Sequence, residues 1–154
     1  MMDDLRELYQ EVILDHGKHP RNYGSLEDYN HTAHGHNPMC GDTLVLYLKT
    51  DGEGLIQNVT FKGQGCAISM ASASLMTDIL KGKTVAEAER LFNAFHEMCT
   101  SDEPQIPADV DEEALERLEV LSGVREFPVR VKCATLAWHT LEAAVHDKNE
   151  VTTE

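Results

Sequence analysis

Residues 43–74, TLVLYLKTDGEGLIQNVTFKGQGCAISMASAS, decide the fold of this 154-residue chain. Residues 43–50 are rich in β-forming side chains, and the Asp-Gly-Glu-Gly sequence at 51–54 favours a hairpin turn. Residues 55–62 alternate imperfectly between apolar and polar, as in a strand that returns beside the first. After Cys66 the small Ala and Ser residues allow close packing on a sheet. The stretch predicts a β-hairpin followed by a helix that covers it.

Further elements are expected on both sides of this hairpin. Residues 29–36 are expected to add a third strand. Apolar residues at helical spacing predict a helix over 4–16. A capping box formed by Thr84 and Glu87 predicts the start of another helix, and a last helix is expected to open near residue 129. The fold class is therefore expected to be α+β, with a small antiparallel three-stranded sheet packed against about five to six helices.

Length and composition predict a single domain over residues 1–154. The chain has 154 residues, of which 42% are hydrophobic, and this is enough to form a substantial core. A proline-containing and acidic stretch leads into an expected helix at 114–121, so residues from about 100 to 122 are interpreted as a helical insertion. The polar tail at 147–154 is expected to fray.

The charge balance limits the possible partners. The chain carries 13 Lys and Arg against 27 Asp and Glu, a formal net charge of -14, which disfavours binding to nucleic acid. No apolar run approaches the roughly 20 residues of a membrane span, and residues 1–11 lack the apolar core of a signal peptide. We expect a cytoplasmic protein whose four cysteines are reduced or metal-bound rather than paired in disulfides.

Three thiols and one carboxylate form the candidate metal site: Cys40, Asp42, Cys66 and Cys133. Such a set can complete one tetrahedral site for a soft metal such as Zn²⁺. Asp42 lies two residues after Cys40, so both side chains would share one face of a strand. Cys66 and Cys133 are expected near helix N-termini, where the helix dipole lowers the pKa of a thiol.

Other residues offer competing interpretations. Cys99 lies in a helical sequence outside these short motifs and is interpreted as structural. The main rival metal cluster is the histidine set His31, His34 and His36. However, clustered histidines on an edge strand are usually solvated. Arg130 and Lys132 could be ordinary surface cations, yet three thiolates and a carboxylate around Zn²⁺ leave a net charge of about -2 that nearby cations would stabilise. These two cations are therefore candidates for electrostatic support and partner binding.

The motifs and their order resemble those of the U-type iron-sulfur assembly proteins, the family of IscU and the NifU N-terminal domain. The resemblance covers most of the chain and includes His-Pro-Arg-Asn at 19–22, Asn-Pro at 37–38 before Cys40-Gly41-Asp42, residues 63–69 and residues 128–133. The scaffold branch of that family places a histidine before its last cysteine, where this chain has Lys132, and it has a shorter stretch between the second and third cysteines. Lysine and insertion together are similar to the SufU branch.

The resemblance implies a function. It implies a zinc-dependent sulfurtransferase in which Cys40 is the catalytic nucleophile and accepts persulfide sulfur from a SufS-type cysteine desulfurase, a pyridoxal-phosphate enzyme. The downstream iron-sulfur assembly machinery would be the second partner. The alternative is a scaffold on which a [2Fe-2S] cluster is built and passed on. A zinc hydrolase is disfavoured because the chain has no HExxH motif and Asp42 would fill the open metal position.

Overall fold

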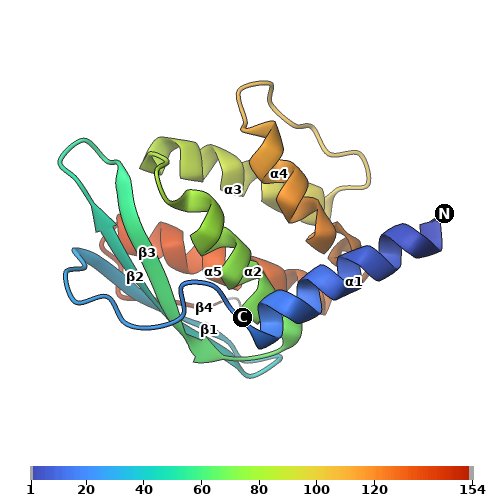
Figure 1. Ribbon diagram of the computed structural model, residues 1–154, viewed down its shortest axis with the longest axis horizontal. Coiled ribbons are helices and arrows are strands. Elements are labelled where there is room, and N and C mark those ends of the chain that lie inside the picture. Colours follow the sequence, from blue (N-terminus) through green and yellow to red (C-terminus); the bar gives the residue numbers. More distant parts are fainter. Residues whose placement is uncertain (1, 153–154) are drawn as a thin grey trace.

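The computed structural model describes residues 2–152, with side chains from residue 9 onward, as a four-stranded sheet and a set of helices (Figure 1). The strands are β1 (His31–Asn37), β2 (Asp42–Thr50), β3 (Ile56–Gln64) and β4 (Glu150–Thr152), in the spatial order β3-β2-β1-β4. Strands β1, β2 and β3 pair antiparallel, and Asn37 is the register partner of Asp42. The predicted hairpin and third strand are therefore confirmed.

The prediction of a three-stranded antiparallel sheet was wrong, because β4 adds a fourth strand parallel to β1. His34 N donates to Asn149 O (2.8 Å), and Val151 packs partly buried against the core. The polar tail is therefore paired over 150–152, whereas residues 153–154 lie outside the described part. Three residues are too few to show an alternating pattern, so this strand could not be predicted from its sequence.

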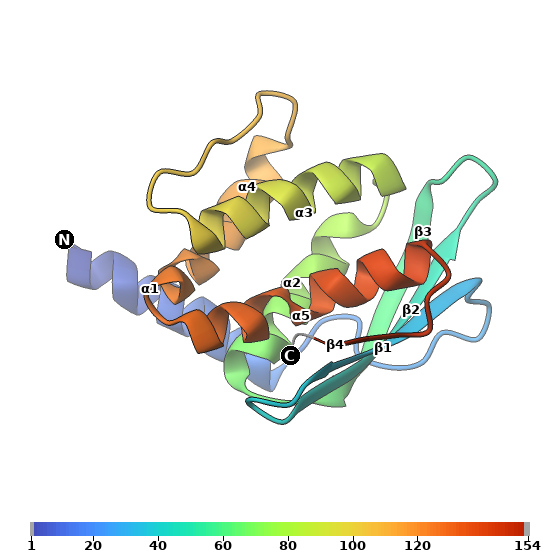
Figure 2. The same ribbon diagram turned by 180° about the vertical axis from the view of Figure 1, so that it is seen from behind.

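Five α-helices and one 3₁₀-helix are present among the described residues. They are α1 (Met2–Lys18), α2 (Ala67–Leu80), α3 (Val85–Thr100), α4 (Glu112–Leu118), the 3₁₀-helix η1 (Glu119–Glu126) and α5 (Pro128–Val145). Helices α2 and α5 pack on the sheet, and α3 and α4 lie on the far side of these two helices (Figures 1 and 2). The helix predicted at 114–121 is thus divided between α4 and η1. No helix within residues 2–152 is both long and apolar enough to cross a membrane.

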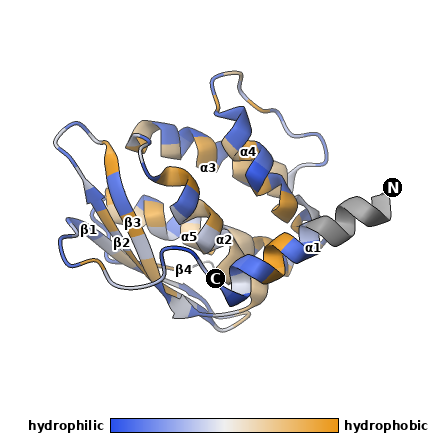
Figure 3. Ribbon diagram, in the orientation of Figure 1, coloured by the Kyte–Doolittle hydropathy of each residue, from blue (hydrophilic) through white to orange (hydrophobic). Residues whose placement is uncertain are grey.

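Small residues allow the helices to approach the sheet closely. The middle of α2 consists of buried Ala and Ser side chains, at residues 71–74. On β1, Gly35 faces α5, and a Cβ atom there would overlap Thr140 Oγ1. Figure 3 shows apolar residues concentrated on the inner helices, while α4 is largely hydrophilic. Helix α5 packs against β1, β2 and α2. This packing places the first turns of α5 near the β1–β2 turn.

The predicted capping box is present at the start of α3. Glu87 N donates to Thr84 Oγ1 (3.1 Å), and Thr84 N donates to Glu87 Oε1 (3.0 Å). Helix α4 begins similarly, because Ala114 N donates to the Asp111 carboxylate (3.2 Å). Such caps satisfy N–H groups that have no partner inside the helix.

Candidate metal centre

The turn between β1 and β2 and the first residue of β2 supply two of the predicted ligands. The pairing of Asn37 with Asp42 closes the ladder and leaves residues 38–41 as the turn. Gly41 has φ +70°, a conformation that glycine adopts without strain. Cys40 is half-buried in this turn, whereas Asp42 begins β2 and is fully buried. The turn therefore presents a thiol and a carboxylate toward the protein interior.

Helix α5 supplies a third ligand. Cys133 lies in the second turn of α5, and its Sγ is 3.2 Å from Cys40 Sγ. One ligand atom each from Cys40, Asp42 and Cys133 lie within 4.8 Å of one another. Two sulfurs bound to one zinc ion in a tetrahedron would be about 3.8 Å apart, given a Zn–S distance of about 2.3 Å. The three side chains therefore fit a metal ion with only small movements.

Cys66 stands beside this group rather than within it. It is the N-cap residue of α2, and its backbone N donates to Asp42 Oδ1 (2.8 Å). Its thiol is outside the set of mutually close ligand atoms. It nevertheless lies near enough to the Cys133 thiol to raise the pKa of that thiol. The structure thus brings together three of the four predicted ligands and holds the fourth next to them through the backbone.

The expectation of a lowered thiol pKa was wrong for Cys133. Burial raises the pKa of Cys133, and contacts with the Cys40 thiol, Asp42 and the Cys66 thiol raise it further. Helix α5 begins at Pro128, so Cys133 is one turn beyond the free N–H groups and is also fully buried. Metal binding to this thiol requires loss of its proton, as it does for other cysteine ligands.

Two supporting residues were not predicted as part of the site. Asn37 is fully buried, and its Nδ2 donates to Asp42 Oδ2 (3.1 Å) and toward Cys133 Sγ (3.5 Å). Gly65 packs against Asp42 so closely that a Cβ atom would overlap Oδ1 of the carboxylate. For Gly65 the sequence offered a signal, because this residue directly precedes the candidate ligand Cys66. Asn37 lies three residues before Cys40, and its contacts depend on strand register and helix packing. Together the two residues fix the orientation of the carboxylate.

The two predicted cations differ in position. Arg130 is exposed, and its Nη1 lies 4.0 Å from Cys40 Sγ. A contact with the Cys133 thiol and the charges of nearby cysteines raise the pKa of Arg130. Lys132 is half-buried on α5, and its side chain makes no hydrogen bond or ion pair with the described residues. Arg130 is therefore the cation that the structure places at the cysteines.

The histidines of β1 and Cys99 add no ligand to this centre. His34 and His36 are exposed on β1, while His31 Nδ1 lies 3.1 Å from Ala144 O. Cys99 is fully buried in α3, and burial raises its pKa to about 12. Within residues 9–152, the His, Cys, Asp and Glu side chains form one group of three or more whose ligand atoms lie close together, and it consists of Cys40, Asp42 and Cys133.

Comparison with known families identifies the chain. The sequence profile of the NifU-like N-terminal domain matches residues 8–134. This chain belongs to that family. The resemblance inferred from the sequence motifs is therefore confirmed, and the matched region of the NifU-like domain includes all four predicted ligands.

Several relatives of this NifU-like chain carry functional names. The zinc-dependent sulfurtransferase SufU of Bacillus subtilis is 42% identical over 142 residues, which cover 92% of each chain. The iron-sulfur cluster assembly scaffold protein IscU of Streptococcus pyogenes is 41% identical over 144 residues, covering 94% of this chain and 86% of the relative. A crystal structure of a putative iron-sulfur cluster assembly scaffold protein for the SUF system, from Fervidobacterium islandicum, superposes with a TM-score of 0.76 at 36% identity. It covers 88% of this chain and 94% of that one.

Proposed function

We propose that this chain is a zinc-dependent sulfurtransferase that accepts persulfide sulfur from a cysteine desulfurase for iron-sulfur cluster assembly. The observation that carries the proposal is the convergence of Cys40, Asp42 and Cys133, with Cys66 beside them. The B. subtilis relative named a zinc-dependent sulfurtransferase supports the same assignment. The chain would therefore act as an enzyme within a sulfur-transfer pathway.

The residues that would hold the metal are Cys40, Asp42, Cys66 and Cys133. Two thiolates and a buried carboxylate, completed by a third thiolate from Cys66, are donors suited to Zn²⁺. When bound, zinc would stabilise the thiolate forms of these cysteines and keep Cys40 unreactive until a partner is in place. Asn37 and the Cys66 backbone N–H would hold the Asp42 carboxylate in position.

Cys40 is the proposed nucleophile because it is half-buried on the β1–β2 turn, whereas Asp42 and Cys133 are fully buried. Its thiolate would attack the terminal sulfur of the persulfide on the desulfurase cysteine. A new S–S bond forms on Cys40, the S–S bond of the partner breaks, and the partner cysteine leaves as a thiolate, so no external oxidant or reductant is needed. Arg130, 4.0 Å from Cys40 Sγ, would stabilise the negative charge on the sulfur atoms.

Exposed apolar residues next to the cysteines support docking of a protein partner there. Met39 precedes Cys40 and is 62% exposed, while Phe127, at the start of α5, is 60% exposed. A hollow of about 580 Å³ adjoins Phe127 and Arg130 and is lined also by Ile13 and Ile68. Large exposed apolar side chains of this kind are typical of protein interaction sites.

Persulfide mapping tests the transfer reaction. The zinc-loaded protein would be mixed with a cysteine desulfurase and L-cysteine, and the sulfur adducts would be located by mass spectrometry. We expect a persulfide on Cys40 and faster desulfurase turnover, both lost in Cys40→Ala. The matched control Cys99→Ala removes a buried thiol outside the site and should behave as the wild type. Turnover stimulated equally by Cys40→Ala would contradict the proposal.

A scaffold function is the second candidate, because the S. pyogenes relative named a scaffold is nearly as similar as the sulfurtransferase. The same ligands would then hold a [2Fe-2S] cluster, with Asp42 as its labile ligand. Anaerobic loading with iron and sulfide would give a stable visible chromophore that can be passed on, and Asp42→Ala would prolong its lifetime. Such a transferable cluster, formed with no persulfide on Cys40, would favour the scaffold over sulfur transfer.

A further inference from the structure

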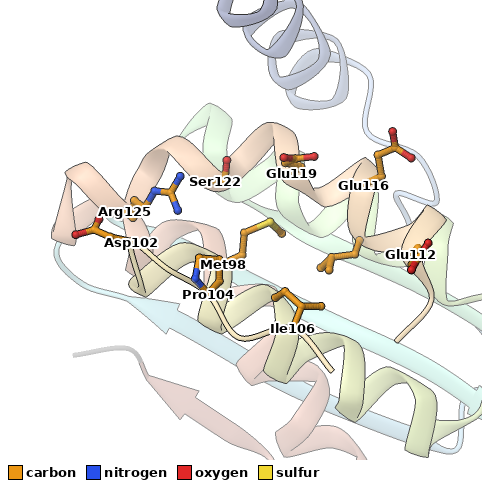
Figure 4. Close-up of a pocket in the computed structure, with 10 residues that line it drawn as sticks. Met98, Asp102, Pro104, Ile106, Glu112, Glu116, Glu119, Ser122 and Arg125 are labelled. Atoms are coloured by element: carbon orange, nitrogen blue, oxygen red, sulfur yellow. The ribbon is translucent and has the colours of Figure 1, made fainter. Parts of the chain in front are cut away.

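A groove that shares no residue with the metal centre lies between α3, the 101–111 loop and the α4–η1 segment (Figure 4). Its volume is about 490 Å³. Its apolar lining comes from Met98 on α3, Leu115 on α4, and Pro104 and Ile106 in the loop. Ile106 remains 40% exposed, so this lining is open to a ligand from outside.

Carboxylates surround this apolar lining. Glu112, Glu116 and Glu119 follow the i, i+4, i+7 spacing along one side of α4 and the start of η1, and Asp102 lies near the other end (Figure 4). Across the described side chains, none of the four takes part in an ion pair. Arg125 is the one basic residue of the lining, and its Nη1 donates to the backbone carbonyl of Ser101 (3.1 Å).

Apart from Arg125, basic residues on and next to α3 and α4 already pair with other carboxylates. Three ion pairs connect them to carboxylates outside the groove: Arg117–Asp78 (2.7 Å), Lys83–Asp111 (2.6 Å) and Arg90–Asp109 (3.6 Å). Like charges four residues apart on a helix repel and destabilise it. Glu112, Glu116 and Glu119 therefore form an uncompensated negative row that a bound cationic group would neutralise.

The spacing of the carboxylates distinguishes a peptide from a metal ion. A metal ion needs several ligand atoms around one point, and these carboxylates do not form such a group within the described residues. Glu112 and Glu119 are instead separated along the helix axis by roughly 10 Å, as seven residues at about 1.5 Å each require. This length suits separate Lys or Arg side chains on a single segment.

We propose that the groove binds a cationic amphipathic segment of a partner protein. Its apolar side chains would cover Met98 and Ile106, and its Lys or Arg side chains would pair with the glutamates on the rim. A second copy of this chain is an unsuitable occupant because two molecules with a net charge of -14 repel each other. The site is separate from the cysteines, so it would add a second point of contact between the protein and a partner.

Peptide binding tests the charge complementarity. The probe is a labelled peptide with lysines at i, i+4 and i+7 and leucines on the adjacent face, and its affinity for the full-length zinc-loaded protein is measured by fluorescence anisotropy. We expect saturable binding that weakens about tenfold or more in the triple variant Glu112→Gln/Glu116→Gln/Glu119→Gln. The matched variant Glu27→Gln/Asp28→Asn/Glu53→Gln removes the same charge from exposed positions outside the groove and should weaken binding by about twofold or less.

A second pair of variants tests the apolar contact. Ile106→Ser should weaken binding at both low and high salt, whereas Leu55→Ser, at a similarly exposed position outside the groove, should not. Equal weakening by the two charge variants, equal binding of a peptide with Glu in place of Lys, or absence of saturable binding would each overturn the proposal. Zinc content should stay unchanged in the groove variants, so a loss of peptide binding is distinguished from damage to the metal centre, and the peptide test does not depend on the proposed sulfur transfer.

Discussion

At the residue scale, the orientation of Asp42 depends on the absence of a side chain at position 65. The Asp42 carboxylate accepts hydrogen bonds from Asn37 and from the Cys66 backbone, and Gly65 packs directly against it. Each contact removes one direction in which the carboxylate could turn. A buried carboxylate fixed in this way needs little rearrangement to bind a metal ion, which lowers the entropic penalty of binding.

Gly65→Ala is therefore expected to displace Asp42 and to reduce zinc binding. The added methyl group would overlap Asp42 Oδ1, and overpacking of this kind destabilises a protein by about 1–3 kcal/mol. Zinc content after purification and the melting temperature should both fall. Gly52→Ala is the control, because a Cβ atom at this hairpin position meets no other atom within 4 Å. Full zinc content in Gly65→Ala would show that the carboxylate can rearrange.

Cys99 should remain unreactive in the folded protein. Burial raises the pKa of its thiol to about 12, so at about pH 8 it is ionised in roughly one molecule in ten thousand. After removal of metal with a chelator, iodoacetamide at that pH should modify Cys40 and leave Cys99 unmodified until denaturant is added. Peptide mass spectrometry measures both sites. Modification of Cys99 at the rate of Cys40 would mean that α3 opens readily.

At the element scale, the sequence was sufficient to predict those elements whose structure depends on residues close together in the chain. The strands around the 51–54 turn and the Thr84 capping box were predicted because a turn and a cap depend on residues close together in the chain. The role of Asn37 could not be predicted, because its contact with Asp42 depends on strand register and its contact with Cys133 depends on how α5 packs. Burial of Cys133 is likewise a property of the assembled layers, so its raised pKa was missed.

The junction of α1 with α2 should make stability depend on pH. His16 is buried in the last turns of α1, with Nδ1 2.7 Å from Ser74 Oγ, and burial followed by the charge of Arg21 lowers the pKa of its imidazole. The unfolded chain then binds a proton more readily than the folded one, so stability is retained above about pH 6.5 and lost as the pH falls.

The melting temperature should therefore fall between about pH 7 and about pH 5, with a shallower fall in His16→Asn. Asparagine keeps a neutral polar group near Ser74 and cannot take up a proton in this range. His34→Asn replaces an exposed histidine on β1 and should retain the slope of the wild type. Identical slopes in all three proteins would show that His16 does not contribute to acid destabilisation.

At the scale of the whole molecule, the proposed zinc site connects elements that are far apart in the chain. Cys40 and Asp42 come from the β1–β2 connection and β2, Cys66 from the start of α2, and Cys133 from α5. A metal ion held by all four would link the sheet to both helices that pack on it. A ligand that binds only the folded state stabilises it by about 4 kcal/mol at a thousand times its dissociation constant.

Removal of zinc should therefore lower the melting temperature of the entire domain, not only loosen the turn. Scanning fluorimetry before chelation, after chelation and after addition of zinc measures this effect, and zinc should restore the original value. Cys133→Ser should melt like the chelated wild type and respond weakly to added zinc, whereas Cys99→Ala should retain the full response. A melting temperature unaffected by chelation would argue against a structural contribution of the metal.

The two edges of the sheet are arranged in a way that opposes aggregation through strand pairing. The outer edge of β3 is occupied at Phe61 by backbone hydrogen bonds with Asn22 and Gly24, and at Ile56 by hydrogen bonds with residues 82–83. The outer edge of β1 is paired with β4, which is three residues long and begins with Glu150. Long open edges allow strands of separate molecules to join, whereas short and charged edges oppose this. The chain can therefore leave large apolar side chains such as Met39 and Phe127 exposed while its sheet offers other copies little backbone to extend into fibres.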